Sequence, residues 1–236
     1  MMVSNNLFKS YIEAGKAFLQ QPTPEQTLRT GAVSGDRPVI VPIRSIGPSH
    51  RERIATHLLA LSESDRYLRF GFAASDEQIG RYVEKLNFER DEIFGIYNRK
   101  LQLIAMAHLA FSDDPEFQNG AEFGVSVMAK ARGRGYGARL FDIAVMHARN
   151  DGVDMMFIHA LSENTAMLNI ARKAGAQVES AGSESEAFLK LPPANLDSHM
   201  TEMVEEQIAQ TDYHFKVQAK KFHDFVAGLQ DARRIS

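Results

Sequence analysis

Apolar residues in the middle of the chain recur with two different periods, which predicts a mixture of helices and strands. His50–Leu61 and Asp76–Leu86 have the helical spacing of three to four residues, and Ser75 is a suitable N-cap for the second helix. Glu92–Tyr97 and Leu101–Phe111 are apolar runs joined by a short polar turn, a pattern typical of a β-hairpin. Two later apolar runs predict further strands at Ala121–Met128 and Met155–Leu161.

Both ends of the chain carry amphipathic patterns outside this central region. Leu7–Leu19 predicts a short helix, and the glycines and prolines that follow it predict a linker. Val39–Arg44 predicts a first strand, and Pro42 within it indicates an edge strand or a bulge. We therefore expect three parts: residues 1–38 with the short helix and linker, residues 39–191 as the main domain, and residues 192–236 with a long helix.

The long C-terminal helix is predicted over Met200–Leu229 by an apolar stripe that continues for its whole length. The stripe consists of Met200, Val204, Ile208, Thr211, Phe215, Ala219, Phe222, Val226 and Leu229. Its partner is the Leu7–Leu19 helix, the same segment of a second subunit, or the sheet of its own domain. The Leu7–Leu19 helix spans roughly 20 Å against about 45 Å for the long helix, so it covers only part of the stripe. We therefore predict a homodimer in which the C-terminal helices contribute to the interface.

Composition narrows the classes of function that this chain can have. It has 236 residues and 44% hydrophobic content, enough for a substantial core. The net charge of −3 provides no general attraction to nucleic acid or to a membrane surface. The absence of cysteine excludes disulfides, thiolate metal sites and cysteine catalysis. The N-terminus has no long apolar run that would indicate a signal peptide or membrane span, and we expect a cytoplasmic protein.

The most informative segment is a basic, glycine-rich turn between a strand and a helix. The turn is Arg132-Gly-Arg-Gly-Tyr-Gly137, and the helix after it places Leu140, Ile143, Ala144 and His147 on one face. Backbone N–H groups and the positive end of the helix dipole converge at such a turn, which suits phosphate oxygens. Lys130–Arg139 contains four basic residues and no acid. The segment therefore predicts a phosphorylated cofactor.

Other interpretations of this turn are less favourable. The Walker pattern needs a lysine and a hydroxyl residue directly after the glycines, and neither is present. Gly133-x-Gly135-x-x-Ala138 is close to a dinucleotide fingerprint, but at least three strand-like runs precede it, whereas that motif follows the first strand. A disordered nucleic-acid-binding tract lacks the packed context that the neighbouring apolar strands and helix provide.

The turn and its surroundings resemble the GNAT superfamily of acyl-CoA-dependent N-acyltransferases. Arg132-x-x-Gly135-x-Gly137 is similar to the family's Gln/Arg-x-x-Gly-x-Gly/Ala signature. Val125 and Val127 lie in a strand upstream, and Asn164-x-x-Met-x-x-Ile-x-x-Lys-x-Gly175 resembles the family's second conserved segment. The arginine-rich run Ser64–Phe70 looks like the turn between the family's first two helices. The resemblance extends over Val39–Leu191.

This resemblance implies an α+β fold with a mostly antiparallel central sheet, splayed between Ala121–Met128 and Met155–Leu161 and flanked by helices. It also implies that acetyl-CoA donates an acyl group to a primary amine, and that the protein is bacterial. Residues 39–191 then form the acyltransferase domain. The positions that would bind the cofactor are Val125, Ser126, Val127, Arg132, Gly133, Arg134, Gly135, Tyr136, Gly137, Ala138 and Asn164.

An amine must lose a proton before it attacks the thioester, so a carboxylate is needed nearby. Glu122 is the first candidate, because its setting Ala-Glu-Phe-Gly-Val-Ser-Val resembles that of the catalytic glutamate of Pat-type bacterial protein lysine acetyltransferases. Glu163 is the alternative, although a residue at this position can simply favour the helix dipole. Asn164 has two roles open to it, as a helix cap and as a cofactor contact.

Many family members have a tyrosine that protonates the departing CoA thiolate, and this chain has Ala171 at that position. Because Ala171 differs from the family pattern, a rival interpretation stays open, in which the chain is a non-catalytic acyl-CoA-binding or assembly module. The eight histidines show no ligand spacing with carboxylates, so no metal is predicted. A protein lysine is favoured as acceptor by the Pat-type similarity, and polyamines, amino acids and other small amines stay open.

Overall fold

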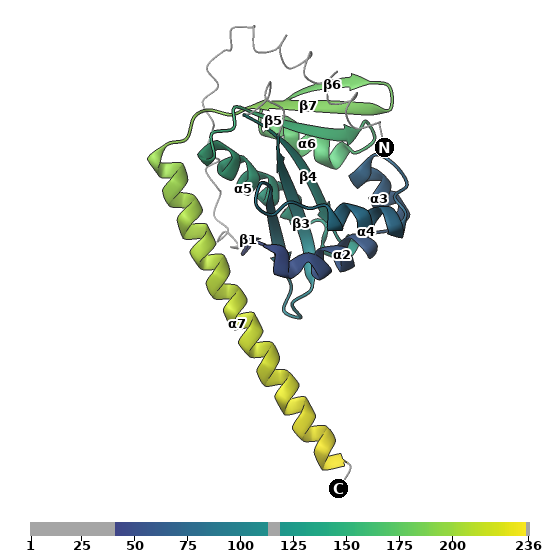
Figure 1. Cartoon of the computed structure of the whole chain (residues 1–236), viewed down its shortest axis with the longest axis vertical. Helices are drawn as coiled ribbons and strands as arrows, with labels where there is room; N and C mark the ends of the chain where they lie inside the picture. The colour runs from purple at the N-terminus through teal and green to yellow at the C-terminus, as the bar shows by residue number, and fades with distance from the viewer. Residues whose placement is uncertain (1–40, 113–118, 235–236) are drawn as a thin grey trace.

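The computed structural model describes residues 41–112 and 119–234, and it contains one mixed sheet with helices on both faces (Figure 1). The strand order is β1-β2-β3-β4-β5-β7-β6, and every neighbouring pair is antiparallel except β4 and β5. The strands are β1 (Arg44–Ser45), β2 (Glu92–Tyr97), β3 (Leu103–Phe111), β4 (Gly120–Val127), β5 (Met155–Leu161), β6 (Gln177–Ala181) and β7 (Glu184–Lys190). The α+β fold and the predicted hairpin are confirmed.

Helices cover both faces of the sheet. The α-helices are α2 (Arg51–Leu59), α3 (Glu63–Phe70), α4 (Asp76–Glu84), α5 (Tyr136–Asn150), α6 (Thr165–Lys173) and α7 (Leu196–Arg234). Two 3-10 turns, η1 (Pro48–His50) and η3 (Ala129–Ala131), complete the described elements. Residues of α5 and α6 share one core cluster with the sheet, and residues of α2 and α4 form a second cluster with its other face. The predicted helix at Leu7–Leu19 and the linker lie outside the described residues.

Two predictions about local structure need correction. Among the described residues, the first strand is Arg44–Ser45, because residues 41–43 of the run predicted at Val39–Arg44 do not pair with β2. Residues 39 and 40 lie outside the described part of the chain. The run Ser64–Phe70 belongs to a helix, α3, rather than to a turn. The Ser62 hydroxyl caps α3 by accepting from the Asp65 N–H, and Gly71 ends it with a left-handed φ of 77°. At α4 the predicted Ser75 cap is confirmed, as part of a capping box with Gln78.

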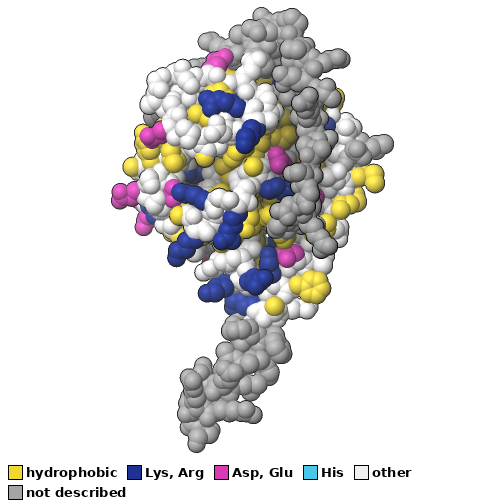
Figure 2. Space-filling model, turned by 180° about the vertical axis from the view of Figure 1, so that it is seen from behind, with side chains coloured by type: hydrophobic (Ala, Val, Ile, Leu, Met, Phe, Trp, Pro, Cys, Tyr) yellow, Lys and Arg dark blue, Asp and Glu magenta, His cyan; other side chains and the backbone are white. Residues whose placement is uncertain are grey.

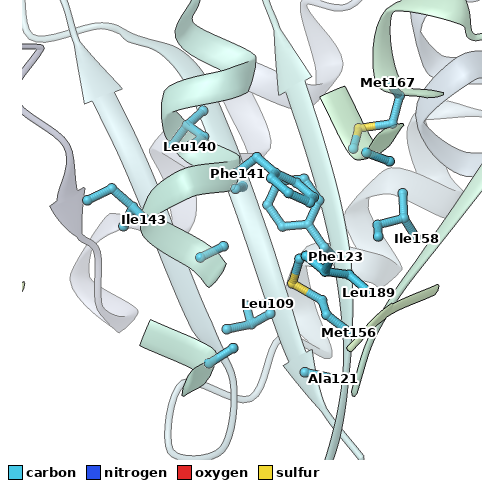
Figure 3. Packing of buried hydrophobic residues seen from close by; sticks show 14 of the residues in the cluster. Leu109, Ala121, Phe123, Leu140, Phe141, Ile143, Met156, Ile158, Met167 and Leu189 are labelled. Carbon is cyan, nitrogen blue, oxygen red and sulfur yellow. The ribbon is translucent and has the colours of Figure 1, made fainter. Parts of the chain in front are cut away.

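The larger core cluster fixes the strand before the glycine turn against the helix after it (Figure 3). Phe123 of β4 and Phe141 of α5 meet edge to face, with ring centroids 5.0 Å apart. Both rings are almost fully buried, together with Leu109 and Met156 on the neighbouring strands. This packing places the start of α5 directly beyond the end of β4.

The sheet opens between its two parallel strands, as predicted. Only Gly120, Ala121 and Glu122 of β4 pair with β5, opposite Met155, Met156 and Phe157. Beyond Glu122, β4 continues along β3 while β5 continues along β7. The second half of β4 therefore has no strand partner on its β5 side, and a gap opens there.

Helix α7 runs along one side of the domain and extends beyond it (Figure 1). Its polar face contacts the domain. Gln210 accepts a 3.1 Å hydrogen bond from Arg44, the Tyr213 hydroxyl accepts one of 2.7 Å from Arg53, and Glu202 accepts from Asn150. The apolar stripe points away from its own sheet, because Met200, Val204, Ile208 and Phe215 are exposed by 40–67%. The side chains of Phe222, Val226 and Leu229 lie outside the described set. None of the described helices is long and apolar enough to span a membrane.

Candidate active site

The gap beside β4 contains a cavity of about 410 Å³. Its walls come from the second half of β4, the glycine turn, the first turns of α5 and α6, and α3. The lining residues are Leu61, Asp65, Leu68, Arg69, Val125, Ser126, Val127, Arg132, Gly133, Gly135, Tyr136, Gly137, Ala138, Asn164, Ala166, Met167 and Ile170. All the residues predicted to bind the cofactor line this cavity except Arg134, which is exposed on the turn.

The glycine turn presents the N-terminus of α5 to the cavity. Gly133 and Gly135 have left-handed φ values of 75° and 76°, which favour glycine. Gly135 is the N-cap of α5 and provides no side-chain cap for the first N–H groups of the helix. Those N–H groups and the helix dipole can therefore bind an anion at this end of the cavity.

Basic side chains surround the turn. Lys130, Arg132 and Arg134 are exposed, and Arg139 is partly exposed. Figure 2 shows that dark-blue Lys and Arg side chains are more prominent than magenta carboxylates on one face of the molecule. Basic side chains thus predominate on this face although the overall charge is −3. A basic rim and a helix N-terminus together suit a ligand with several phosphate charges.

Two polar contacts tie α3 to the cofactor side of the cavity. Asp65 forms an ion pair with Arg132 of the glycine turn. Burial opposes ionisation of Asp65, but Arg132 and Ser62 outweigh it and keep the pKa of this carboxyl below its usual value. The Asn164 carbonyl caps α6 by accepting from the Met167 N–H at 3.2 Å, and its amide donates to the Leu68 carbonyl at 3.4 Å. The capping role of Asn164 is confirmed.

Ser126 connects the cavity wall to a buried histidine. His57 is 1% exposed, and burial lowers its pKa, so the ring is neutral near pH 7. Its Nδ1 lies 2.9 Å from the Leu103 carbonyl, which can only accept, so Nδ1 carries the proton. The Ser126 hydroxyl therefore donates to Nε2 at 2.8 Å. This pair fixes α2 against β3 and β4.

Glu122 lies beside the cavity rather than in its wall. Phe123 points into the α5 cluster, so the alternation along β4 places Glu122, Gly124 and Ser126 on the opposite face, toward α2 and α3. Glu122 is exposed at the last position where β4 and β5 pair. Two residues of a strand separate it from Gly124 by about 7 Å. Glu163, the alternative base, is exposed before the α6 cap, and Ala171 is fully buried in the core.

Several residues that line the cavity were not predicted from the sequence, and most of them belong to α3 and α6. Leu61 and Leu68 have the spacing of ordinary core residues, so nothing in the sequence distinguishes them. Met167 and Ile170 belong to the segment after Asn164 that resembles the family's second conserved segment, but that resemblance did not assign them to the cavity. Arg69 could have been predicted as a site residue, because it belongs to the arginine-rich run at Ser64–Phe70. The assumption that this run is a turn concealed its orientation, since a helix directs Arg69 toward β4.

An open sheet divided at two parallel strands, with a free helix N-terminus at the end of one of them, is the arrangement that the resemblance to acyl-CoA-dependent transferases implies. Comparison with known proteins agrees. The sequence model of the Acetyltransferase (GNAT) family matches residues 58–176. The chain therefore belongs to the GNAT acetyltransferase family and is an acyltransferase. No curated protein matches the sequence.

Solved structures share the fold at low sequence identity. The GNAT domain of S. lividans PAT is 19% identical with a TM-score of 0.54, and the match covers 63% of this chain and 89% of that domain. A GNAT acetyltransferase from Streptococcus pneumoniae is 12% identical with a TM-score of 0.53, covering 64% and 98%. An N-acetyltransferase from Staphylococcus aureus Mu50 is 15% identical with a TM-score of 0.52, covering 64% and 98%.

Proposed function

We propose that this protein transfers an acetyl group from acetyl-CoA to a primary amine. The observation that carries the proposal is the cavity along the unpaired half of β4, which ends at the glycine-capped N-terminus of α5. This arrangement offers an extended molecule an apolar channel with an anion site at one end. CoA has that character, because an amide-containing arm joins its thiol to a pyrophosphate.

In the proposed complex, the pyrophosphate binds the N–H groups of the turn at Gly133–Gly137, with Arg132 and Arg134 at its edge. The pantetheine arm lies along Val125, Ser126 and Val127, where the backbone of β4 has no partner on the β5 side. Tyr136, Ala138 and Asn164 complete the walls. The thioester then lies in the gap between β4 and β5, facing the Glu122 end of the strand.

Glu122 is the proposed general base. A lysine-like amine with a pKa of about 10.4 is protonated at neutral pH, and exposing its lone pair costs roughly 4–5 kcal/mol. Glu122 accepts that proton, directly or through water, as the nitrogen attacks the thioester carbon. The C–N bond forms, the C–S bond breaks, and CoA leaves as the thiolate. Backbone N–H groups of β4 are the proposed donors to the oxyanion. With Ala171 buried, the thiolate takes its proton from solvent.

A protein lysine is the acceptor that the sequence around Glu122 favours, through its similarity to Pat-type enzymes. The rival proposal is a module that binds acyl-CoA without chemistry. The two are separated by incubating the protein with isotopically labelled acetyl-CoA and a mixture of amines and cell lysate proteins. Labelled amides detected by mass spectrometry support the transferase. Measurable acetyl-CoA binding with no labelled product from any acceptor would instead support the binding module.

We also propose that the α7 helices of two copies pair through the apolar stripe. The exposed stripe faces away from the domain, and burying side chains such as Phe215 and Ile208 contributes roughly 1.5–3 kcal/mol each. The Phe215→Asp variant is expected to convert a dimer to a monomer in light scattering at micromolar concentration. Phe72→Asp, on an aromatic ring exposed by 48% in the loop after α3, is the control and should leave the dimer intact. A wild-type monomer would contradict the proposal.

A further inference from the structure

Arg69 occupies a distinctive place between the cofactor cavity and Glu122. It lies in the last turn of α3, lines the cavity, and covers Gly124 of β4. A Cβ atom at Gly124 would lie 2.6–2.7 Å from the guanidinium Cζ, Nη1 and Nη2 atoms. The absence of a side chain at Gly124 is therefore what lets the guanidinium lie against the strand.

A chain of hydrogen bonds holds the guanidinium in that position. Arg69 Nη2 donates to the Tyr82 hydroxyl at 3.1 Å, and that hydroxyl lies 2.7 Å from His108 Nδ1. His108 Nε2 lies 3.1 Å from a carboxylate oxygen of Asp91, which is buried. Because Asp91 accepts from Nε2, Nε2 carries a proton, and Nδ1 is the ring atom hydrogen-bonded to the tyrosine hydroxyl. The chain runs from a buried carboxylate to the cavity wall and fixes the orientation of Arg69.

Within the part of the chain that the structure describes, the guanidinium of Arg69 lies near the rings of Phe70 and Tyr82 but forms no ion pair. No carboxylate in residues 41–112 and 119–234 forms an ion pair with it, and its single hydrogen bond in this part goes to a neutral hydroxyl. A guanidinium carries five N–H donors in a planar fork that matches a carboxylate. A fixed cation with donors to spare, at the edge of a cavity, is a site for an anionic group.

We infer that Arg69 binds a carboxylate carried by the acceptor, next to the amine that is acylated. This inference rests on the proposed function. Glu122 and Gly124 lie on the same strand face about 7 Å apart, so an amine delivered to Glu122 brings its near substituents over Gly124. The carboxylate is the α-carboxylate of an amino acid or an acidic side chain beside a peptide lysine. Polycationic amines are disfavoured, because they place positive charge against the guanidinium.

The experiment compares matched acceptors that differ only in this carboxylate. One pair is an amino acid and its amide; the second is a lysine peptide with a neighbouring Glu and the same peptide with Gln. CoA release gives kcat/KM for each acceptor in the wild type, Arg69→Gln, Gly124→Ala and the control Arg99→Gln. Gly124→Ala keeps the arginine but displaces its guanidinium, and Arg99 is exposed in the turn between β2 and β3. Thermal unfolding verifies that each variant is folded.

The wild type should prefer the carboxylate in at least one pair by tenfold or more, and the pair that does so identifies the source. In Arg69→Gln and Gly124→Ala this preference should fall below about threefold, while Arg99→Gln retains it. Equal activity of the wild type on both members of each pair would overturn the inference but leave the transferase intact. An equal loss of kcat/KM on all acceptors in Arg69→Gln would also overturn the inference, because it would place Arg69 on the thioester. A preference for succinyl-CoA over acetyl-CoA that requires Arg69 would overturn it as well, because Arg69 would then bind the acyl group. Absence of any acylation would count against the proposed function itself.

Discussion

Gly135 and Gly137 of the glycine turn have different geometries, and this difference separates an effect on the fold from the effect proposed on CoA binding. Gly137 lies in the first turn of α5 without a positive φ, and an added Cβ would contact Ile170 Cδ1 at 3.4 Å. Alanine is favoured over glycine in a helix by about 0.5–1 kcal/mol. Gly137→Ala should therefore leave Tm unchanged or raise it by a few degrees. Its methyl group enters the cavity wall, and we expect CoA to bind at least tenfold more weakly, about 1.4 kcal/mol.

Gly135→Ala should behave differently, because Gly135 has a φ of 76° and open space around its Cα. A non-glycine residue in this region costs roughly 1–2 kcal/mol. Both Tm and CoA affinity are expected to fall. Gly152 is the matched control, since it has a φ of 78°, open surroundings and no place in the cavity. Gly152→Ala should lower Tm by a similar amount and leave affinity unchanged.

Isothermal titration calorimetry with CoA and a thermal melt measure the two effects for each variant. Gly80→Ala in α4, where nothing lies within 4 Å, is the control for a stabilising helical substitution. Unchanged CoA affinity in both Gly135→Ala and Gly137→Ala would refute the assignment of the pyrophosphate to this turn. Loss of affinity in Gly152→Ala would show that affinity follows general stability instead.

Two further predictions concern the packing around the site. Burial acts most strongly on His147 and lowers its pKa, but Glu202, Glu92 and Asp151 together raise the pKa above its usual 6.5. The contact of protonated His147 with α7 therefore stabilises the fold fully below about pH 6.5, and this stabilisation is lost as pH rises through the raised pKa. Thermal melts at several pH values should show Tm falling over this range. In Glu202→Gln the fall in Tm should be smaller. Ser126→Ala leaves the buried His57 Nε2 without its donor. The free energy of unfolding measured in urea should fall by about 1–3 kcal/mol. An unchanged free energy of unfolding would mean that water replaces the hydroxyl.

Much of the fold was predictable because its signals are local. The hairpin, the cap at Ser75 and the turn before α5 each depend on a few neighbouring residues, and the structure contains all three. The prediction of a splayed sheet came from the family resemblance of the glycine turn and the Asn164 segment. The periodicity of apolar residues alone does not predict how the strands are arranged in the sheet. The turn predicted at Ser64–Phe70 is wrong, because the cap at Ser62 and the stop at Gly71 define a two-turn helix that is short and mostly polar.

The orientation of side chains across elements was beyond the reach of the sequence. Nothing in the sequence indicates that Arg69 lies on Gly124, because the contact needs the relative placement of α3 and β4. The long helix shows the same limit. The apolar stripe of α7 was evident, but which face would contact the domain depended on polar partners such as Arg44 and Arg53 on other elements.

The central claim is that Glu122 removes a proton from an amine beside acyl-CoA bound in the cavity. The most direct test is the turnover of Glu122→Gln on the best acceptor found, with acetyl-CoA affinity measured on the same sample and Glu163→Gln as the control. We expect kcat to fall by about 10²–10⁴ in Glu122→Gln, with affinity for acetyl-CoA within about twofold of the wild type and Glu163→Gln nearly unaffected. Undiminished turnover in Glu122→Gln, on every acceptor that the wild type acylates, would contradict this account.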